Sequence, residues 1–203
     1  MPLQSKLAGA VAAILFAASS QAALVIDQQQ TDASAYMAGF VQPDLAQSFQ
    51  QSHNNIAGAG IHLQSGIGVT DTVTISLWDM LPNQVGASKL ASGSGLATSG
   101  TDFDVFWSPV AITAGNTYFL EFTSANDALG IAGAVNDPYG FGQVYANSGF
   151  GSFPDFDYTF RTWYDDGGVQ GNVPEPGSLA LLGLALLGLG MLGAALVRRR
   201  GKA

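Results

Sequence analysis

Two histidines, His53 and His62, are the side chains of this 203-residue chain best suited to acid–base catalysis near neutral pH. His53 lies in the polar stretch Gln50–Asn55, which predicts a turn, and His62 lies in a predicted strand with its side chain opposite those of its neighbours. Neither belongs to a Gly-x-Ser-x-Gly, His-Glu-x-x-His or phosphate-loop pattern. The chain has no cysteine, which excludes thiolate nucleophiles, thiolate zinc sites and disulfides.

Paired carboxylates are a second kind of side chain that could do chemistry. Asp102/Asp104 and Asp155/Asp157 are each two residues apart, so in a strand each pair would point to one side. Two facing carboxylates can hydrolyse glycosides, but this spacing fits solvated acids equally well. The turn-rich sequence around Asp137, Asp155 and Asp157 makes these three the candidate ligands of a calcium ion, with solvated turn residues as the alternative.

Aromatic side chains are concentrated between Tyr139 and Tyr164, where ten of them alternate with glycines. In a loop, Tyr139, Phe141 and Phe150 could stack their flat faces on sugar rings. The alternative is a packed loop that covers one end of the domain. The stretch therefore offers a candidate surface for a glycan and no candidate nucleophile.

The elements that would position these residues are predicted to be β-strands, because the apolar residues alternate with a period of two. Val73, Ile75 and Leu77 share one face of Asp71–Asp79. Pro109, inside the predicted strand 103–112, indicates an edge or a bulge. Short strands separated by turn residues predict an all-β domain, an antiparallel β-sandwich. The predicted strands are 24–27, 45–49, 56–64, 71–79, 89–96, 103–112, 117–123, 129–135, 142–146 and 157–163.

Residues 1–22 have the pattern of a secretory signal peptide. Lys6 provides the positive charge, and Leu7–Ala18 is an apolar segment too short to span a bilayer. Ser20-Gln21-Ala22 matches a small-residue cleavage site, so we expect cleavage between Ala22 and Ala23.

The C-terminal segment predicts a single transmembrane helix. Gly177–Val197 is a run of 21 uncharged residues, long enough to cross the hydrocarbon core. The basic residues Arg198, Arg199, Arg200 and Lys202 follow it and are expected to stay cytoplasmic. The domain before the helix is therefore expected on the exported side.

The whole tail resembles the PEP-CTERM sorting signal of Gram-negative bacteria. Val173-Pro174-Glu175-Pro176 precedes the Leu/Gly/Ala-rich helix, and the arginine cluster ends the tail, so all three parts occur in order. The resemblance implies processing by an exosortase, transient insertion in the inner membrane, and delivery to the cell surface or the extracellular polysaccharide. A permanent single-span anchor is the alternative.

The exported part also resembles a recurring domain of PEP-CTERM surface proteins. The resemblance implies a jelly-roll-like sandwich, an architecture that binds sugars in many modules. We therefore expect a signal peptide at 1–22, a β-sandwich domain at 23–170 and a sorting signal at 171–203. The residues that carry the resemblance are Gln47–Phe49, Val73–Asp79, Asp104–Pro109, Leu129–Gly133, Gly142–Tyr145 and Phe156–Arg161.

The charge of the exported domain excludes one class of partner. Residues 23–170 contain two basic and fourteen acidic residues, a net charge of −12, which disfavours nucleic acid binding. Together these features predict a non-enzymatic surface or extracellular-matrix protein without a required cofactor, which binds exopolysaccharide. The alternatives are a secreted hydrolase with an unrecognised site and a structural spacer or adhesin without a ligand.

Overall fold

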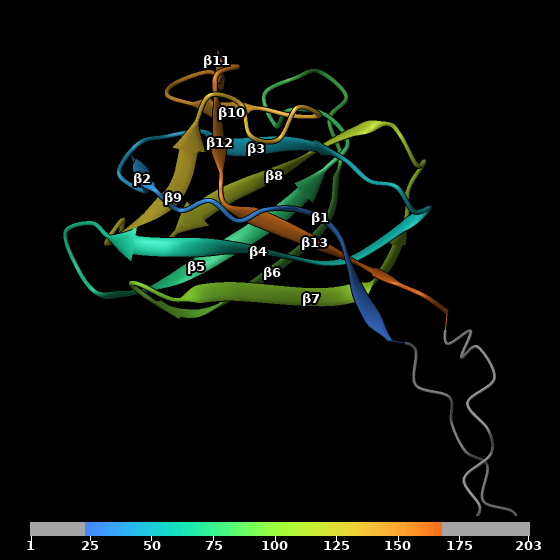
Figure 1. Cartoon of the computed structure of the whole chain (residues 1–203), viewed down its shortest axis with the longest axis horizontal. Coiled ribbons are helices and arrows are strands. Elements are labelled where there is room, and N and C mark those ends of the chain that lie inside the picture. Colours follow the sequence, from blue (N-terminus) through green and yellow to red (C-terminus); the bar gives the residue numbers. More distant parts are fainter. Residues whose placement is uncertain (1–22, 168–203) are drawn as a thin grey trace, which may run out of the picture. The chain divides into compact units, whose positions relative to one another are not determined.

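The computed structural model describes residues 23–167, which form thirteen β-strands and no helix (Figure 1). This confirms the predicted all-β class. Within this range the structure offers no helix that could cross a membrane. The predicted signal peptide, the Pro-Glu-Pro motif and the helix with its basic tail lie outside the described residues, as does Ala22 of the predicted cleavage site.

Every strand pairing is antiparallel, and the strands form two sheets. In the first sheet the order is β1-β13-β4-β9-β12, with β2 beside β9 and β7 beside β4. Its strands are β1 (Leu24–Gln30), β2 (Ala35–Gly39), β4 (Asn55–Ser65), β7 (Asp102–Ala111), β9 (Leu129–Val135), β12 (Phe156–Tyr158) and β13 (Phe160–Asp165).

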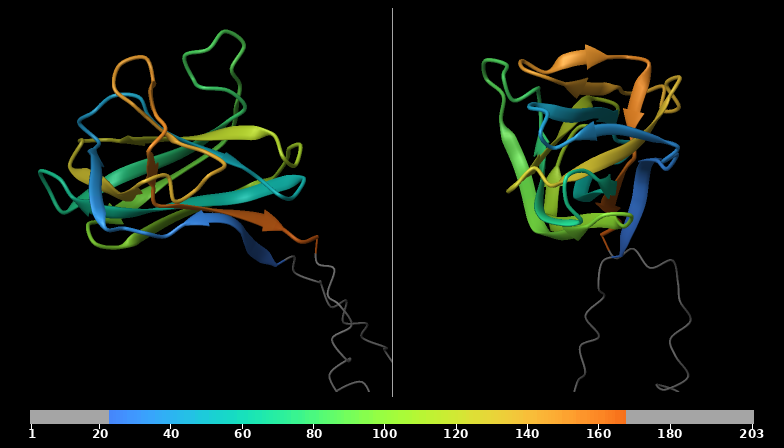
Figure 2. Two further views of the ribbon diagram at one scale, coloured as in Figure 1. Left: turned by 45° about the horizontal axis from the view of Figure 1, so that its top comes forward. Right: turned by 90° about the vertical axis from the view of Figure 1, so that its left-hand side faces the viewer.

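The second sheet has six strands in the order β11-β10-β3-β8-β5-β6. Its strands are β3 (Leu45–Gln50), β5 (Thr70–Trp78), β6 (Lys89–Thr98), β8 (Thr117–Ser124), β10 (Val144–Ala146) and β11 (Gly151–Phe153). Figure 2 shows the two sheets facing each other. Apolar side chains from both sheets join in one core, so residues 23–167 form a unit with its own interior.

The predicted alternation is confirmed in the strands that face this core. Val73, Ile75 and Leu77 of β5 have no exposed surface. The edge or bulge predicted at Pro109 is confirmed. Strand β7 pairs with β4 alone, and the register shifts between Ile56 and Gly58, opposite this proline. A proline is tolerated there since the bulge needs no ladder hydrogen bond from it.

Three details differ from the prediction. The segment 157–163 forms parts of two strands, because its pairing partner changes at Thr159: β12 before it pairs with β9, and β13 after it pairs with β4. The N–H of Thr159 donates to the carbonyl of Ala132. The strands β2 and β11 were not predicted. Both are short, and β11 is rich in small and turn-forming residues, so neither shows a clear alternation.

A buried carboxylate orders the connection between β8 and β9. Asp71 accepts hydrogen bonds from Ser124 Oγ (2.9 Å), from both nitrogens of Asn126 (2.9 and 3.1 Å) and from Ala128 N (3.0 Å). Burial raises the pKa of Asp71, but these donors outweigh burial and lower the pKa to about 2. The ionised carboxylate therefore stabilises the folded loop.

We expect Asp71→Asn to lower the free energy of unfolding by about 2 kcal/mol, because an amide cannot accept all of these bonds. Since the folded-state pKa lies below the ordinary value of 3.8, the stabilisation is complete above that pH and is lost as the pH falls through about 2. Urea denaturation of both proteins between pH 6 and pH 2 measures this. Asp127→Asn is the matched control, because Asp127 is exposed in the same loop and its positive φ of 55° suits asparagine. A constant difference across the pH range would contradict the assignment.

Candidate functional site

A cleft of about 340 Å³ opens between the two sheets, where β2, β9 and β12 of the first sheet approach β10 and β11 of the second. These strands lie together in the upper left of Figure 1. The volume is within the range of small-ligand sites. The side chains that line it are aliphatic, aromatic or amide, and none is charged: Ala35, Tyr36, Met37, Gln42, Val135, Val144, Ala146, Asn147, Phe153, Phe156 and Tyr158.

A β-bulge in β2 brings consecutive side chains to the cleft. Tyr36 pairs with Ala132 and Ala38 pairs with Ile131, so Met37 is the extra residue. In a regular strand Tyr36 and Met37 would point to opposite faces, whereas the bulge lets both line the cleft.

Two glycines of β9 make room for these side chains. A Cβ atom on Gly130 would collide with the ring of Tyr36, and one on Gly133 would collide with the Cγ of Met37. The ring of Tyr36 therefore lies close to the backbone of β9, while about half of its surface stays exposed (51%). Such a ring is a platform on which another flat, apolar face can pack.

Two phenylalanines and two amides complete the wall. The rings of Phe153 and Phe156 meet edge to face, with centroids 6.4 Å apart. Gln42 accepts a hydrogen bond from Gly39 N through its Oε1 (3.2 Å), which leaves its NH₂ group as a donor for a ligand. Asn147, with a positive φ of 65°, lies in the loop after β10. Aromatic faces beside amide groups can stack on a ring and bond its hydroxyls.

Tyr158 has an unusual hydroxyl. The residue is 1% exposed and packs edge to face on Phe122, with centroids 5.8 Å apart. Burial raises the pKa of its phenol. Its Oη atom is the one buried side-chain N or O atom of the described residues that makes no hydrogen bond. An unpaired buried hydroxyl is costly, which marks Tyr158 as a residue that could bond a ligand.

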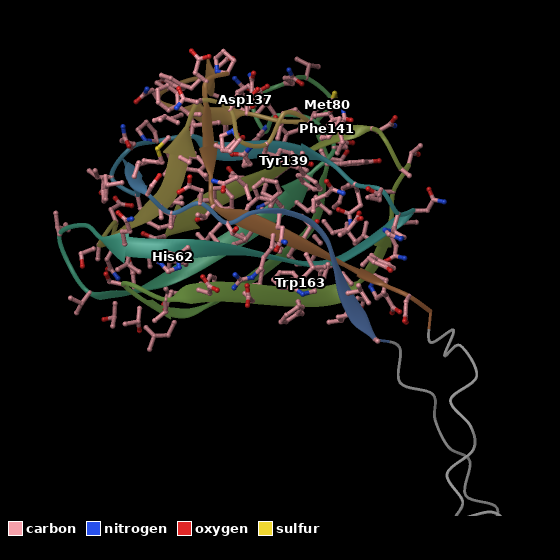
Figure 3. The ribbon with its side chains drawn as sticks, in the orientation of Figure 1. His62, Met80, Asp137, Tyr139, Phe141 and Trp163 are labelled. Carbon is pink, nitrogen blue, oxygen red and sulfur yellow. The ribbon has the colours of Figure 1, made fainter. Side chains whose placement is uncertain are left out.

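Two of the three predicted stacking residues, Tyr139 and Phe150, are buried, each only 7% exposed. Tyr139 packs on Phe160 at 4.9 Å, and its hydroxyl donates to Gln28 Oε1 at 2.9 Å. Neither ring offers a free face, so the rival interpretation, a packed loop, is correct for these two residues. Phe141 is exposed and lies beside Tyr139, with ring centroids 6.1 Å apart (Figure 3). It does not line the cleft.

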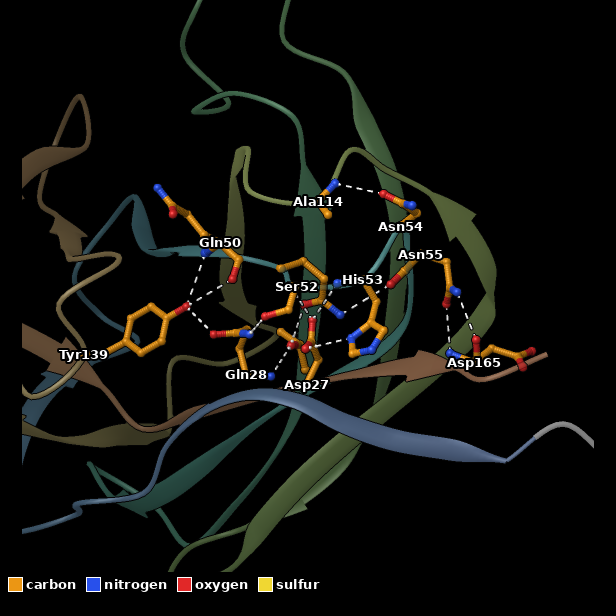
Figure 4. Close-up of polar contacts among 12 residues, drawn as sticks. Asp27, Gln28, Gln50, Ser52, His53, Asn54, Asn55, Ala114, Tyr139 and Asp165 are labelled. Atoms are coloured by element: carbon orange, nitrogen blue, oxygen red, sulfur yellow. Dashed lines mark hydrogen bonds and ion pairs between the residues drawn. The ribbon is translucent and has the colours of Figure 1, made fainter. Parts of the chain in front are cut away.

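His53 is paired with a carboxylate from β1. Its Nδ1 lies 2.9 Å from Asp27 Oδ1, and Asp27 Oδ2 accepts from Ser52 N at 2.7 Å (Figure 4). The imidazole ring stacks on Tyr164 at 3.6 Å. Ser52 Oγ accepts a hydrogen bond from Gln28 Nε2 at 2.8 Å, and not from His53. This arrangement fastens β1 to the turn before β4.

His62 belongs to a second, separate polar cluster. Its Nδ1 lies 2.8 Å from Asp102 Oδ1, while Arg161 contacts both Asp102 and Asp104 at 2.6 Å. The prediction that Asp102 and Asp104 point to one side is therefore confirmed. Bonds from His62 and Arg161 outweigh burial and lower the pKa of Asp102, whereas burial raises the pKa of Asp104. A hollow of about 220 Å³ adjoins His62, Asp102 and Arg161.

Of the three predicted calcium ligands, Asp137 donates its N–H to the carbonyl of Asp155 at 3.2 Å, whereas the carboxylate of Asp157 is occupied by protein donors. Asp157 is fully buried, and its two oxygens accept from Gln47 Nε2 (2.7 Å) and Tyr139 N (2.9 Å). Burial raises the pKa of Asp157. Asp155 is exposed in the turn before β12, so the two carboxylates do not share one side of a strand. Among residues 23–167, no three His, Asp or Glu side chains gather in a way that could hold a metal ion.

The remaining predicted site residues concern processing. Ala23 is the first described residue, and its N–H donates to Asp166 Oδ1 at 3.1 Å. Val173, Pro174, Glu175, Pro176, Arg198, Arg199, Arg200 and Lys202 lie outside the described residues. Comparisons of the chain with protein-family models, curated proteins and solved structures find no match.

The different burial of the three predicted stacking residues has a measurable consequence. We expect Tyr139→Ala and Phe150→Ala each to lower the free energy of unfolding by about 3 kcal/mol, because each empties a packed position. Phe141→Ala should change it by less than about 0.5 kcal/mol, since 64% of its surface is exposed. Urea denaturation of residues 23–167 measures all three. Equal, small effects would mean that Tyr139 and Phe150 are not packed as described.

Proposed function

We propose that this protein is a non-enzymatic component of the cell surface or extracellular matrix that binds exopolysaccharide through the cleft. The observation that carries the proposal is the lining of the cleft. Tyr36, Phe153 and Phe156 supply aromatic faces, and Gln42 and Asn147 supply amide donors and acceptors. Sugar rings present apolar C–H faces and peripheral hydroxyls, which this combination complements.

Export and sorting are part of the same proposal. The signal peptide pattern of residues 1–22 and the PEP-CTERM-like tail support secretion through the inner membrane followed by exosortase processing. The net charge of −12 in residues 23–170 supports a soluble exported domain that avoids nucleic acid. For the fold, we propose a jelly-roll-like sandwich, which two antiparallel sheets with a shared core support.

A secreted hydrolase is the second candidate function. It is favoured by the pairing of each histidine with an aspartate, because a carboxylate on Nδ1 orients an imidazole for general-base catalysis. His62 is the better candidate of the two, since it adjoins a hollow. Hydrolysis of host polysaccharide that disappears in His62→Gln but not in His53→Gln would favour this function over binding alone.

Processing can be read from the intact mass of the protein recovered from the surface of the native host. We expect a mass that lacks residues 1–22 and most of 177–203, because both segments carry processing signals. In a host strain with the exosortase gene deleted, the protein should keep residues 177–203, and its mass should rise accordingly. If normally growing cells keep the C-terminal helix on the protein, the tail is a plain membrane anchor.

Binding can be tested by retention in the exopolysaccharide. We expect Phe153→Leu and Phe156→Leu each to reduce retention about two- to tenfold, because leucine keeps apolar volume but removes the flat face. Measurement is by quantifying the protein in the polysaccharide fraction, with thermal unfolding as a check on folding. Phe141→Leu is the control, since it changes an exposed phenylalanine of the same aromatic stretch outside the cleft. Unchanged retention in both cleft variants would leave a structural spacer as the better explanation.

A further inference from the structure

Resting on the proposed function, we infer that the cleft selects neutral sugar units that carry a small apolar substituent, such as an N-acetyl group, and that the hydroxyl of Tyr158 bonds this unit. Two properties of the cleft lead to this inference. One is the absence of charge in a strongly acidic domain. The other is the buried hydroxyl of Tyr158, a residue of the cleft lining, which has no hydrogen-bond partner.

The lack of basic side chains in the cleft disfavours the binding of acidic sugars. Lys89 and Arg161 are the two basic residues of 23–167, and neither lines the cleft. Arg161 is held by Asp102 and Asp104, while Lys89 lies over the ring of Trp78, 5.1 Å from its centroid. A uronate or a sulfated sugar would therefore enter a domain of net charge −12 with no cation to pair with it. Neutral sugars have no such penalty.

The aliphatic lining favours an apolar substituent. Five of the lining residues are aliphatic: Ala35, Met37, Val135, Val144 and Ala146. An unsubstituted hexose would place hydroxyl groups against this wall and leave them without partners. A methyl group, as in an acetamido substituent, would instead gain from contact with the wall. The polar atoms of the same substituent can bond the amides of Gln42 and Asn147.

The hydroxyl of Tyr158 is the polar group that we infer to bond the sugar unit. The hydroxyl has almost no accessible surface in the free protein, so a ligand oxygen or N–H would supply its missing hydrogen bond by displacing part of the packing around it. In the free protein this hydroxyl brings only a desolvation cost. Replacing it with hydrogen should therefore leave the free protein as stable or more stable, while weakening the complex. A hydroxyl with only a structural role would show the opposite pattern.

Tyr118 is the matched control. Its hydroxyl accepts a hydrogen bond from Thr113 N at 2.9 Å, and the residue does not line the cleft. Tyr118→Phe should lower the unfolding temperature and leave binding unchanged. Tyr158→Phe should leave the unfolding temperature unchanged or raise it, and weaken binding about two- to tenfold.

The experiment titrates the full chain, in a sugar-free detergent, with glucose, N-acetylglucosamine and glucuronic acid, followed by calorimetry and ligand-observed NMR. These probes share one ring and differ in one substituent. We expect N-acetylglucosamine to bind about fourfold or more tightly than glucose, as one buried methyl group would give. Glucuronic acid should bind at least about tenfold more weakly than N-acetylglucosamine.

Equal binding of the three sugars, preference for glucuronic acid, or unchanged affinity in Tyr158→Phe would overturn the inference. If Phe153→Leu and Phe156→Leu still reduce retention in exopolysaccharide, those results leave the proposed function in place. Failure of the three sugars to bind would also overturn the inference about this sugar class. The proposed function itself fails only when retention does not depend on the cleft.

Discussion

The buried carboxylate of Asp157 is the contact on which the arrangement of the cleft depends. It joins the two sheets, because its oxygens accept from Gln47 of β3 and from the backbone of Tyr139, while Gln47 Oε1 accepts from Tyr158 N at 2.9 Å. An ionised carboxylate without these donors would cost several kcal/mol at this depth. The network therefore holds β12 against the second sheet and fixes Tyr158 in the wall of the cleft.

Much of the sheet could be predicted from the sequence, because burial on one face imposes an alternation that a single strand displays. Val73, Ile75 and Leu77 are the plain example. The bulges could be predicted only where proline signals them, as at Pro109. The bulge at Met37 arises from pairing with β9, a strand about 95 residues later, so no local pattern reveals it.

The site was harder to predict, because the same residue type serves opposite roles in one stretch. Phe153 and Phe156 line the cleft, whereas Phe150 is buried beside Ala46 and Leu81, and nothing in their spacing separates them. The pairing of His62 with Asp102 depends on the register of β4 and β7, which sets these residues opposite each other. A glycine pattern was the available signal for the cleft: in β9, Gly130 lies under the ring of Tyr36, and Gly133 lies against both the side chain of Met37 and the backbone of β12.

The pairing of β13 with both β1 and β4 has a mechanical consequence. The strand follows β12 directly and leads to the end of the described chain, as Figure 1 shows. Tension between a polymer held in the cleft and an attachment beyond residue 167 would run along the length of β13. Its hydrogen bonds to β1 and β4 lie across that direction, so they would be loaded in shear and would have to break together. Under the proposed function, a domain tethered in this way would resist pulling far better than one whose last strand could be peeled off bond by bond.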